Sequence, residues 1–158
     1  MRGEKALFSP RFLGCHAMWR RPWIWKNVSL PEELLEGLST RFLTGFFEAA
    51  AAGHPGDVAI LAELADLYAR QGLYERSLET DEELVAAEPE NPVFRYNLAC
   101  SLSALGRIDR AFEALEKALE LGYEAIEEMR SDPDLENLRK DRRWSRLLSR
   151  FRERRTAR

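Results

Sequence analysis

Histidine and cysteine, which often bind metals or take part in catalysis, are few in this sequence and unsuitably spaced for either task. The two histidines are His16, which follows Cys15, and His54, which lies in a stretch expected to form a helix-ending turn. Neither has the spacing to Cys, Asp or Glu that a metal site needs. Cys100 has no CxxC partner, and the sequence contains neither a glycine-rich phosphate loop nor a G-x-S-x-G motif. We therefore predict no catalysis, no metal ion and no cofactor.

The sequence has no stretch typical of a membrane-spanning or exported segment. A spanning helix needs about 20 consecutive apolar residues, and charged residues interrupt every apolar run before that length. The basic N-terminal residues lack the apolar core of a secretory signal, and the cysteines form no disulfide pattern. We expect a cytoplasmic protein.

Charge is distributed unevenly, with basic ends and an acidic middle. Residues 1–28 carry six Lys/Arg and one Glu, and residues 139–158 carry ten Lys/Arg, one Asp and one Glu. Since the net charge of the chain is −3, residues 29–138 carry about −16. Such ends are most simply solvated. They could also bind nucleic acid or a membrane surface, or lie against the protein's own acidic part in the same chain or across a dimer.

Residues 1–28 have no sustained periodicity and are interpreted as an irregular basic and aromatic extension. Three tryptophans, Trp19, Trp23 and Trp25, are interleaved with basic residues, a pattern that also occurs where proteins contact membrane interfaces or nucleic acid. The simpler interpretation is a loosely ordered extension whose aromatic residues dock onto the first helix. A translation start at Met18 would remove part of it.

The middle of the chain contains an internal repeat of 34 residues. Shifting the sequence by this length aligns Leu64 with Leu98 and Ala65 with Ala99. The apolar spacing in each unit predicts two amphipathic helices joined by a short connection. Ala65 and Ala99 lie where we expect two helices to cross, because small side chains allow the backbones to approach closely.

Capping residues mark the ends of the expected helices. Asp57 is predicted to cap the first helix of one unit, and Asn91 the first helix of the next. Gly72 and Gly106 are predicted to end these helices in the left-handed conformation, which glycine adopts without a steric penalty.

The repeated pattern L-A-x-x-[YL]-x-x-x-G, followed by a small residue and by Pro89 at the end of the first unit, resembles the tetratricopeptide repeat (TPR). The resemblance covers residues 56–123, with units at 58–91 and 92–123. It implies an all-α fold, a short helical solenoid of antiparallel helix pairs with capping helices at both ends.

Two positions depart from the family pattern. Arg95 replaces the usual aromatic residue, and Asp81 stands where a large apolar residue is common. A buried, unpaired carboxylate would be costly, so we expect Asp81 to be exposed or hydrogen-bonded, most simply as a tolerated variation on the surface.

The flanking segments are predicted to cover the ends of the repeats. Residues 29–55 are predicted to form a helix. This helix either covers the N-terminal end of the repeats or is the second helix of a degenerate first repeat. Residues 124–158 resemble the tail that follows the last repeat of bacterial TPR proteins, with D-P-D-L-x-x-L-R at 132–139 and then an aromatic residue and L-L. We interpret this segment as closing helices and a basic tail, in which Trp144 packs on the last repeat rather than binding a ligand.

In the TPR family, the first helices of successive repeats line a concave groove that binds an extended peptide or a partner helix. By position, the groove-lining residues of this chain would be Ala62, Glu63, Asp66, Ala69, Arg70, Val93, Tyr96, Asn97, Cys100 and Ser103. Tyr96 and Asn97 are the best candidates, because an aromatic ring lies beside an amide that can bond a peptide backbone. Asn97 could equally occupy its place without a ligand.

The charges of this groove favour some partners over others. Glu63 and Asp66 would favour a basic or neutral peptide. Some TPR domains hold the acidic C-terminus of a chaperone with a carboxylate clamp, but here Ala62 and Asp66 stand at two places of that clamp, so its function is not supported.

We therefore predict a non-catalytic adaptor or scaffold that binds another protein or peptide, whose identity the sequence does not specify. Two alternatives remain open at this point. One is a secretion or export chaperone, and the other is a protein that binds nucleic acid or a membrane surface through its basic ends.

Overall fold

The computed structural model describes residues 32–156, and the regular structure in this range is entirely helical. In chain order the elements are α1 (Glu32–Gly53), α2 (Val58–Arg70), α3 (Tyr74–Ala87), α4 (Pro92–Ala104), α5 (Ile108–Glu120), α6 (Ile126–Ser131), the 3-10 turn η2 (Pro133–Leu135), α7 (Glu136–Arg139) and α8 (Arg143–Thr156). The predicted extension over 1–28 lies outside the described residues.

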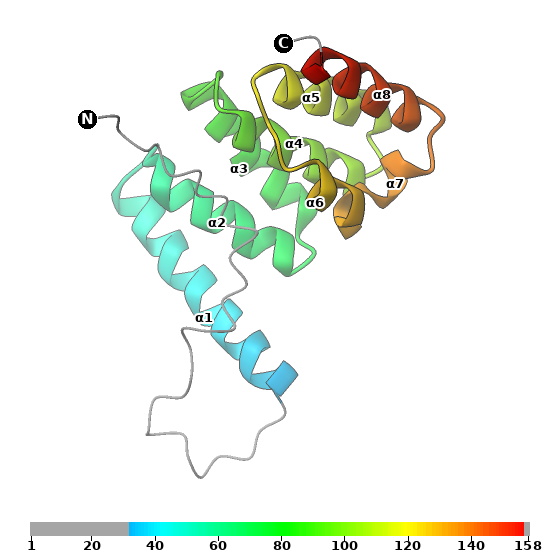
Figure 1. Cartoon of the computed structure of the whole chain (residues 1–158). Helices are drawn as coiled ribbons and strands as arrows, with labels where there is room; N and C mark the ends of the chain where they lie inside the picture. The colour runs from blue at the N-terminus through cyan, green and yellow to red at the C-terminus, as the bar shows by residue number, and fades with distance from the viewer. Residues whose placement is uncertain (1–31, 157–158) are drawn as a thin grey trace, which may run out of the picture.

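Helices α1 to α5 pack against one another in chain order (Figure 1). Helix α2 pairs with α3, α4 pairs with α5, and α3 also packs on α4. Each helix therefore buries its apolar side against its neighbours along the chain, as in a solenoid. The predicted all-α fold of TPR-like helix pairs is confirmed.

The capping residues act as predicted. The Asp57 side chain accepts hydrogen bonds from the backbone nitrogens of Ala59, at 3.0 Å, and Ile60, at 3.2 Å. Asn91 accepts one from the backbone nitrogen of Val93, at 3.0 Å. Gly106, directly after the C-terminal turn of α4, has a φ of 72°, in the left-handed region that favours glycine. These local signals set where α2 and α4 begin and where α4 ends.

Small residues lie at the helix crossings, as predicted from the repeat. Ala65, Ala99 and Ala111 are almost fully buried. Ser77 of α3 donates a hydrogen bond from its hydroxyl to the backbone oxygen of Ala65 in α2, at 3.2 Å. This contact requires the two backbones to lie close together, which larger side chains would prevent.

Asp81 is buried, so its interpretation as a surface variation is wrong. Its side chain is inaccessible to solvent, and the Ser101 hydroxyl of α4 donates to Asp81 Oδ2 at 2.6 Å. Ser77 Oγ lies 3.5 Å from the same oxygen and 3.0 Å from Ser101 Oγ. The expectation that Asp81 would be hydrogen-bonded is confirmed, because the buried Ser101 hydroxyl donates to its carboxyl group and offsets part of the cost of burying it.

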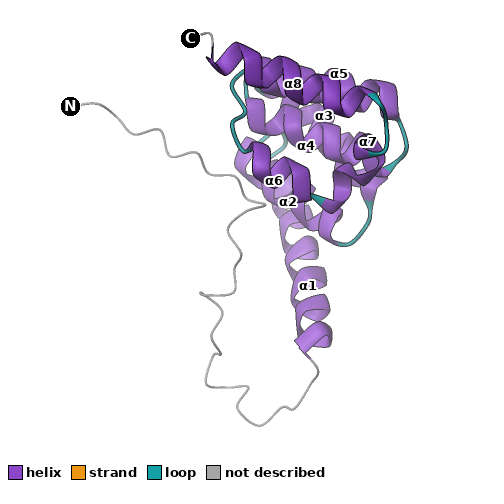
Figure 2. Cartoon of the chain, turned by 45° about the vertical axis from the view of Figure 1, so that its right-hand side comes forward, coloured by secondary structure: helices purple, strands orange, loops and turns teal. Residues whose placement is uncertain are grey.

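Within the segment over 29–55, the chain forms the single long helix α1. It packs on α2, where Gln71 Nε2 donates to Thr44 Oγ1 at 2.7 Å and Tyr68 donates its phenolic hydrogen to Glu48 at 3.0 Å. Helix α1 has 22 residues and α2 has 13. Its N-terminal part consequently extends beyond the body formed by the other helices (Figure 2).

After α5 the chain adds short elements that join the core of the second repeat. Met129, Leu135 and Leu138 are fully buried in it, and Trp144 of α8 is 8% exposed in the same cluster. Trp144 is therefore a packing residue, as predicted.

Helix α8 also brings basic side chains against acidic ones of α5. Arg143 pairs with Asp109 at 2.7 Å, and Arg150 pairs with Glu116 at 3.4 Å. This part of the basic C-terminal region thus lies against the acidic part of the same chain, one of the arrangements that the charge distribution suggested.

Candidate functional site: the concave face of α2 and α4

The predicted groove residues fall into two groups that differ in exposure. On α4, Tyr96, Asn97, Cys100 and Ser103 are at most 6% exposed. Val93, near the start of the same helix, is half-buried. The α4 part of the groove is therefore closed to solvent.

The α2 part of the groove is more open. Glu63 is exposed, Ala62 and Ala69 are half-buried, and the Arg70 side chain is 51% exposed. The Asp66 side chain is only 7% exposed and forms an ion pair with Arg70, four residues further along the helix. Because this pair neutralises Asp66 locally, Glu63 carries the remaining negative charge of the predicted groove residues on α2.

The chain itself covers the α4 face. The covering residues are 123–139, which we call the closing segment, and they include α6, η2 and α7. Both η2 and α7 pack on α4. The ring of Tyr123 stacks on that of Tyr96, with ring centroids 4.3 Å apart and an interplanar angle of 8°.

Asp132 makes the polar contacts at the centre of this cover. Tyr96 donates its phenolic hydrogen to Asp132 Oδ2 at 2.5 Å, and the Cys100 thiol lies 3.7 Å from the same oxygen. Asp132 Oδ1 accepts a hydrogen bond from the backbone nitrogen of Asp134 at 2.9 Å, and Arg139 donates to the backbone oxygen of Asp132. The acidic motif D-P-D-L thus places one carboxylate on two buried polar side chains of α4.

Burial and neighbouring groups keep Tyr96 protonated. Burial raises the pKa of the Tyr96 phenol well above its usual range, and the nearby Cys100 and Asp132 raise that pKa further. The phenol of Tyr96 consequently remains a hydrogen-bond donor to Asp132 at alkaline pH values where an exposed tyrosine ionises.

Two further hydrogen bonds hold the second half of the closing segment. Asn137 donates from Nδ2 to the backbone oxygen of Ser103 at 2.8 Å. Tyr74, at the start of α3, donates to Asp134 Oδ1 at 3.0 Å. The closing segment therefore contacts both repeats, which the sequence analysis did not anticipate.

Tyr96, Cys100 and Ser103 of the predicted groove are buried, and they face residues of their own chain. A partner would reach them only after the closing segment had left. The D-P-D-L tail was predicted to cover the last repeat, but not to lie on the predicted groove. The sequence features that could have indicated this cover are the polar and aromatic residues of α4 and the short acidic motif D-P-D-L.

Two buried side chains of the predicted groove on α4, Asn97 and Ser103, each have a polar atom without a hydrogen-bond partner among the described residues. Asn97 is 6% exposed, and its unpartnered atom is the side-chain oxygen. Asn97 aligns with Glu63 when the sequence is shifted by one repeat. A buried carbonyl oxygen without a donor is costly, so Asn97 lowers the stability of this face.

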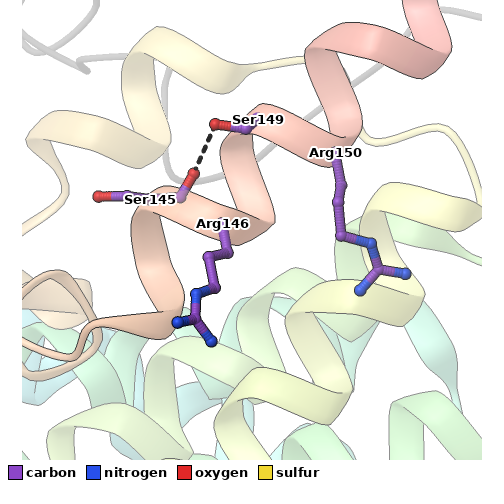
Figure 3. Close-up of a pocket in the computed structure, with 4 residues that line it drawn as sticks. All are labelled: Ser145, Arg146, Ser149 and Arg150. Carbon is purple, nitrogen blue, oxygen red and sulfur yellow. Dashed lines mark hydrogen bonds between the residues drawn. The ribbon is translucent and has the colours of Figure 1, made fainter.

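A surface hollow on α8 is a weaker candidate. Ser145, Arg146, Ser149 and Arg150 line it (Figure 3). All four come from one helix and are exposed. Ser149 already donates to the backbone oxygen of Ser145 at 2.9 Å, and Arg150 pairs with Glu116. An open hollow lined by a single helix encloses no ligand, so we assign no site to it.

Comparison with known proteins agrees with this architecture. Residues 94–121, which include most of α4 and α5, match a family model described as the tetratricopeptide repeat. The match identifies a tetratricopeptide repeat within α4 and α5, and the other described helix pairs have a similar architecture. Repeats of this kind are typical protein-interaction modules.

A curated relative is similar to part of this chain. A protein of Arabidopsis thaliana, named as chloroplastic, is 42% identical over 89 residues, which are 54% of this chain and 27% of the relative. The chain thus spans about a quarter of the length of that relative. Because the relative is a plant protein assigned to the chloroplast by its name, the bacterial type and cytoplasmic location of this chain stay predictions.

Two observations concern other kinds of site. Within residues 32–156, no helix is both long and apolar enough to cross a membrane. Among the described side chains, no group of three or more His, Cys, Asp or Glu is placed to hold a metal ion.

Proposed function

We propose that this protein is a non-catalytic interaction module that binds a peptide or a helix of another protein on the α2 part of its concave face. The observation that carries the proposal is the difference between the two helices. The closing segment covers the α4 face, whereas α2 leaves Glu63 and Arg70 exposed.

The polar groups of this face indicate the chemistry of the partner. Glu63 supplies an exposed negative charge, whereas Arg70 is already paired with Asp66. A peptide with a basic or neutral side chain opposite Glu63 fits this charge.

The proposal is tested by capturing partners from lysate of the native host with the wild-type protein and with Glu63→Lys. Glu83→Lys is the matched control, because Glu83 is also an exposed helical glutamate but lies on α3. We expect one partner to be retained by wild type and by Glu83→Lys and lost by Glu63→Lys.

Direct titration of the captured partner gives the quantitative test. Glu63→Lys should weaken its binding by about tenfold or more, the size of one lost charge contact at an interface. Circular dichroism checks that all variants remain folded. Equal binding by the three proteins would show that α2 is not the contact surface.

The two other roles considered, export chaperone and binding through the basic ends, have no observation of their own among the described residues. The same capture experiment addresses them. An exported protein or nucleic acid retained equally by wild type and Glu63→Lys would favour them over the proposal.

A further inference from the structure

Helix α1 carries a row of large apolar side chains in contact with solvent. Leu38 is 51% exposed, Phe42 is 75% exposed and Phe46 is 59% exposed. These residues follow one another at intervals of four, which places them on one side of the helix. We call them the α1 stripe. An exposed row of this size on a helix indicates a surface that something covers.

The stripe lies opposite the side of α1 that packs on α2. Thr44 is 6% exposed and bonds to Gln71 of α2. It is two residues from both Phe42 and Phe46, and two residues correspond to a rotation of about 200° around a helix. Helix α1 therefore packs on α2 with one side and presents the stripe on the other, which is typical of a helix with neighbours on both.

The arrangement of the other helices identifies the missing neighbour. Helix α3 packs between α2 and α4, its neighbours before and after it in the chain. Helix α1 packs on α2, the neighbour that follows it. In a solenoid each unit is covered by the units adjacent in sequence, and the residues adjacent to α1 on its other side in sequence are those before Glu32.

We propose that residues 19–25, with the sequence WRRPWIW, dock on the α1 stripe of the same chain. This stretch supplies Trp19, Trp23 and Trp25 as partners for Leu38, Phe42 and Phe46. Aromatic rings pack favourably against one another at offset or edge-on angles. The interleaved arginines keep charged groups at the rim of such a contact, where water solvates them.

The length of the intervening chain permits this contact. Trp25 is seven residues before Glu32, and seven residues span at most about 25 Å when extended. Phe42 is ten residues into α1, about 15 Å from its start along the helix axis. A chain that turns back before α1 reaches the stripe without strain. The covalent connection also gives the stretch a high effective concentration relative to a second copy.

Photo-cross-linking of the full chain tests the proposal. The photoreactive residue p-benzoylphenylalanine is introduced at Phe42, the most exposed member of the stripe, and cross-linked peptides are identified by mass spectrometry. An equimolar mixture of chains carrying the light and the heavy isotope of nitrogen separates links within one chain from links between two. The same photoreactive residue at Leu73, which is 39% exposed on the α2–α3 connection, is the control.

We expect the probe at Phe42 to link to peptides containing residues 19–25 with one isotope only. Adding Phe46→Glu should reduce the yield to that of the Leu73 control, while circular dichroism stays unchanged. Links between the two isotopes would assign the stripe to a second copy and overturn the proposal. A yield no higher than that of the Leu73 control would also overturn it.

Discussion

The phenol of Tyr96 on α4 donates a hydrogen bond of 2.5 Å to the carboxylate of Asp132, 36 residues further along the chain. The ring of Tyr96 is 1% exposed and stacks on Tyr123. A residue predicted to contact a partner is therefore part of the contact between the second repeat and the closing segment.

Replacing Tyr96 by phenylalanine removes this donor and keeps the ring. We expect Tyr96→Phe to lower the free energy of unfolding by about 1–3 kcal/mol, because the half-buried carboxylate of Asp132 loses the hydrogen bond from the Tyr96 phenol. Urea unfolding followed by circular dichroism measures the change. Tyr74→Phe is the comparison, since the Tyr74 hydrogen bond to Asp134 also reaches the closing segment but Tyr74 is less buried. A larger loss for Tyr74→Phe would contradict the assignment.

The buried group of Asp81, Ser77 and Ser101 predicts strong coupling between α3 and α4. Asp81→Ala leaves the Ser101 hydroxyl without its acceptor, and we expect a loss of about 2–3 kcal/mol in the free energy of unfolding. In a double-mutant cycle, Asp81→Ala and Ser101→Ala should couple by about 1–3 kcal/mol. If their effects simply add, the 2.6 Å contact does not contribute to stability.

Tyr68 predicts a loss of stability at alkaline pH. Burial is the main cause that raises the pKa of its phenol to about 12, and the hydrogen bond to Glu48 raises it further, whereas Arg76 lowers it. The unfolded chain therefore loses this proton at a lower pH than the folded protein does. The stabilising effect is complete below the ordinary tyrosine pKa of about 10 and is lost as the pH rises toward 12.

Urea unfolding at a series of pH values measures this effect. Between about pH 9 and about pH 11.5, the decrease in the free energy of unfolding should be smaller for Tyr68→Phe than for wild type. Tyr96 and Tyr123 also have raised pKa values, so the decrease should not vanish in this variant. If the two proteins have identical pH profiles, Tyr68 does not contribute to the loss of stability at alkaline pH.

A methyl group added at Gly106 or at Gly37 would meet no atom within 4 Å, so the two positions differ only in their backbone conformation. Gly106 has a φ of 72°, whereas Gly37 lies within α1. We expect Gly106→Ala to destabilise by about 1–2 kcal/mol through backbone conformation alone. Gly37→Ala should instead stabilise by up to about 1 kcal/mol, because alanine loses less entropy in a helix. Thermal unfolding of both variants separates these effects by sign.

Local features of the sequence were sufficient to predict the solenoid. Asp57, Asn91 and Gly106 act on residues within one helical turn of themselves, and the crossing positions follow from the repeat. The burial of Asp81 could not be predicted in this way, because its acceptor role depends on Ser101 in another helix, 20 residues away.

Local sequence patterns also could not predict that the closing segment covers the α4 face of the predicted groove. Helical spacing indicates that Tyr96 and Ser103 share one side of α4, but the cover of these residues depends on contacts of Asp132 and Asn137 with residues more than 30 positions earlier. The repeat describes only neighbouring helices. A segment that packs back across two units therefore cannot be detected from the 34-residue repeat.

The hydrogen bond between Tyr74 and Asp134 joins residues 60 positions apart, and this has a consequence for how the protein is made. During synthesis α4 emerges well before the closing segment. Its apolar and aromatic face, including Tyr96, therefore stays uncovered until residue 139 has left the ribosome. Once the closing segment is in place, the end of the array cannot unfold without breaking contacts that reach back to α3. The two repeats then unfold cooperatively, rather than fraying one after the other from the C-terminus.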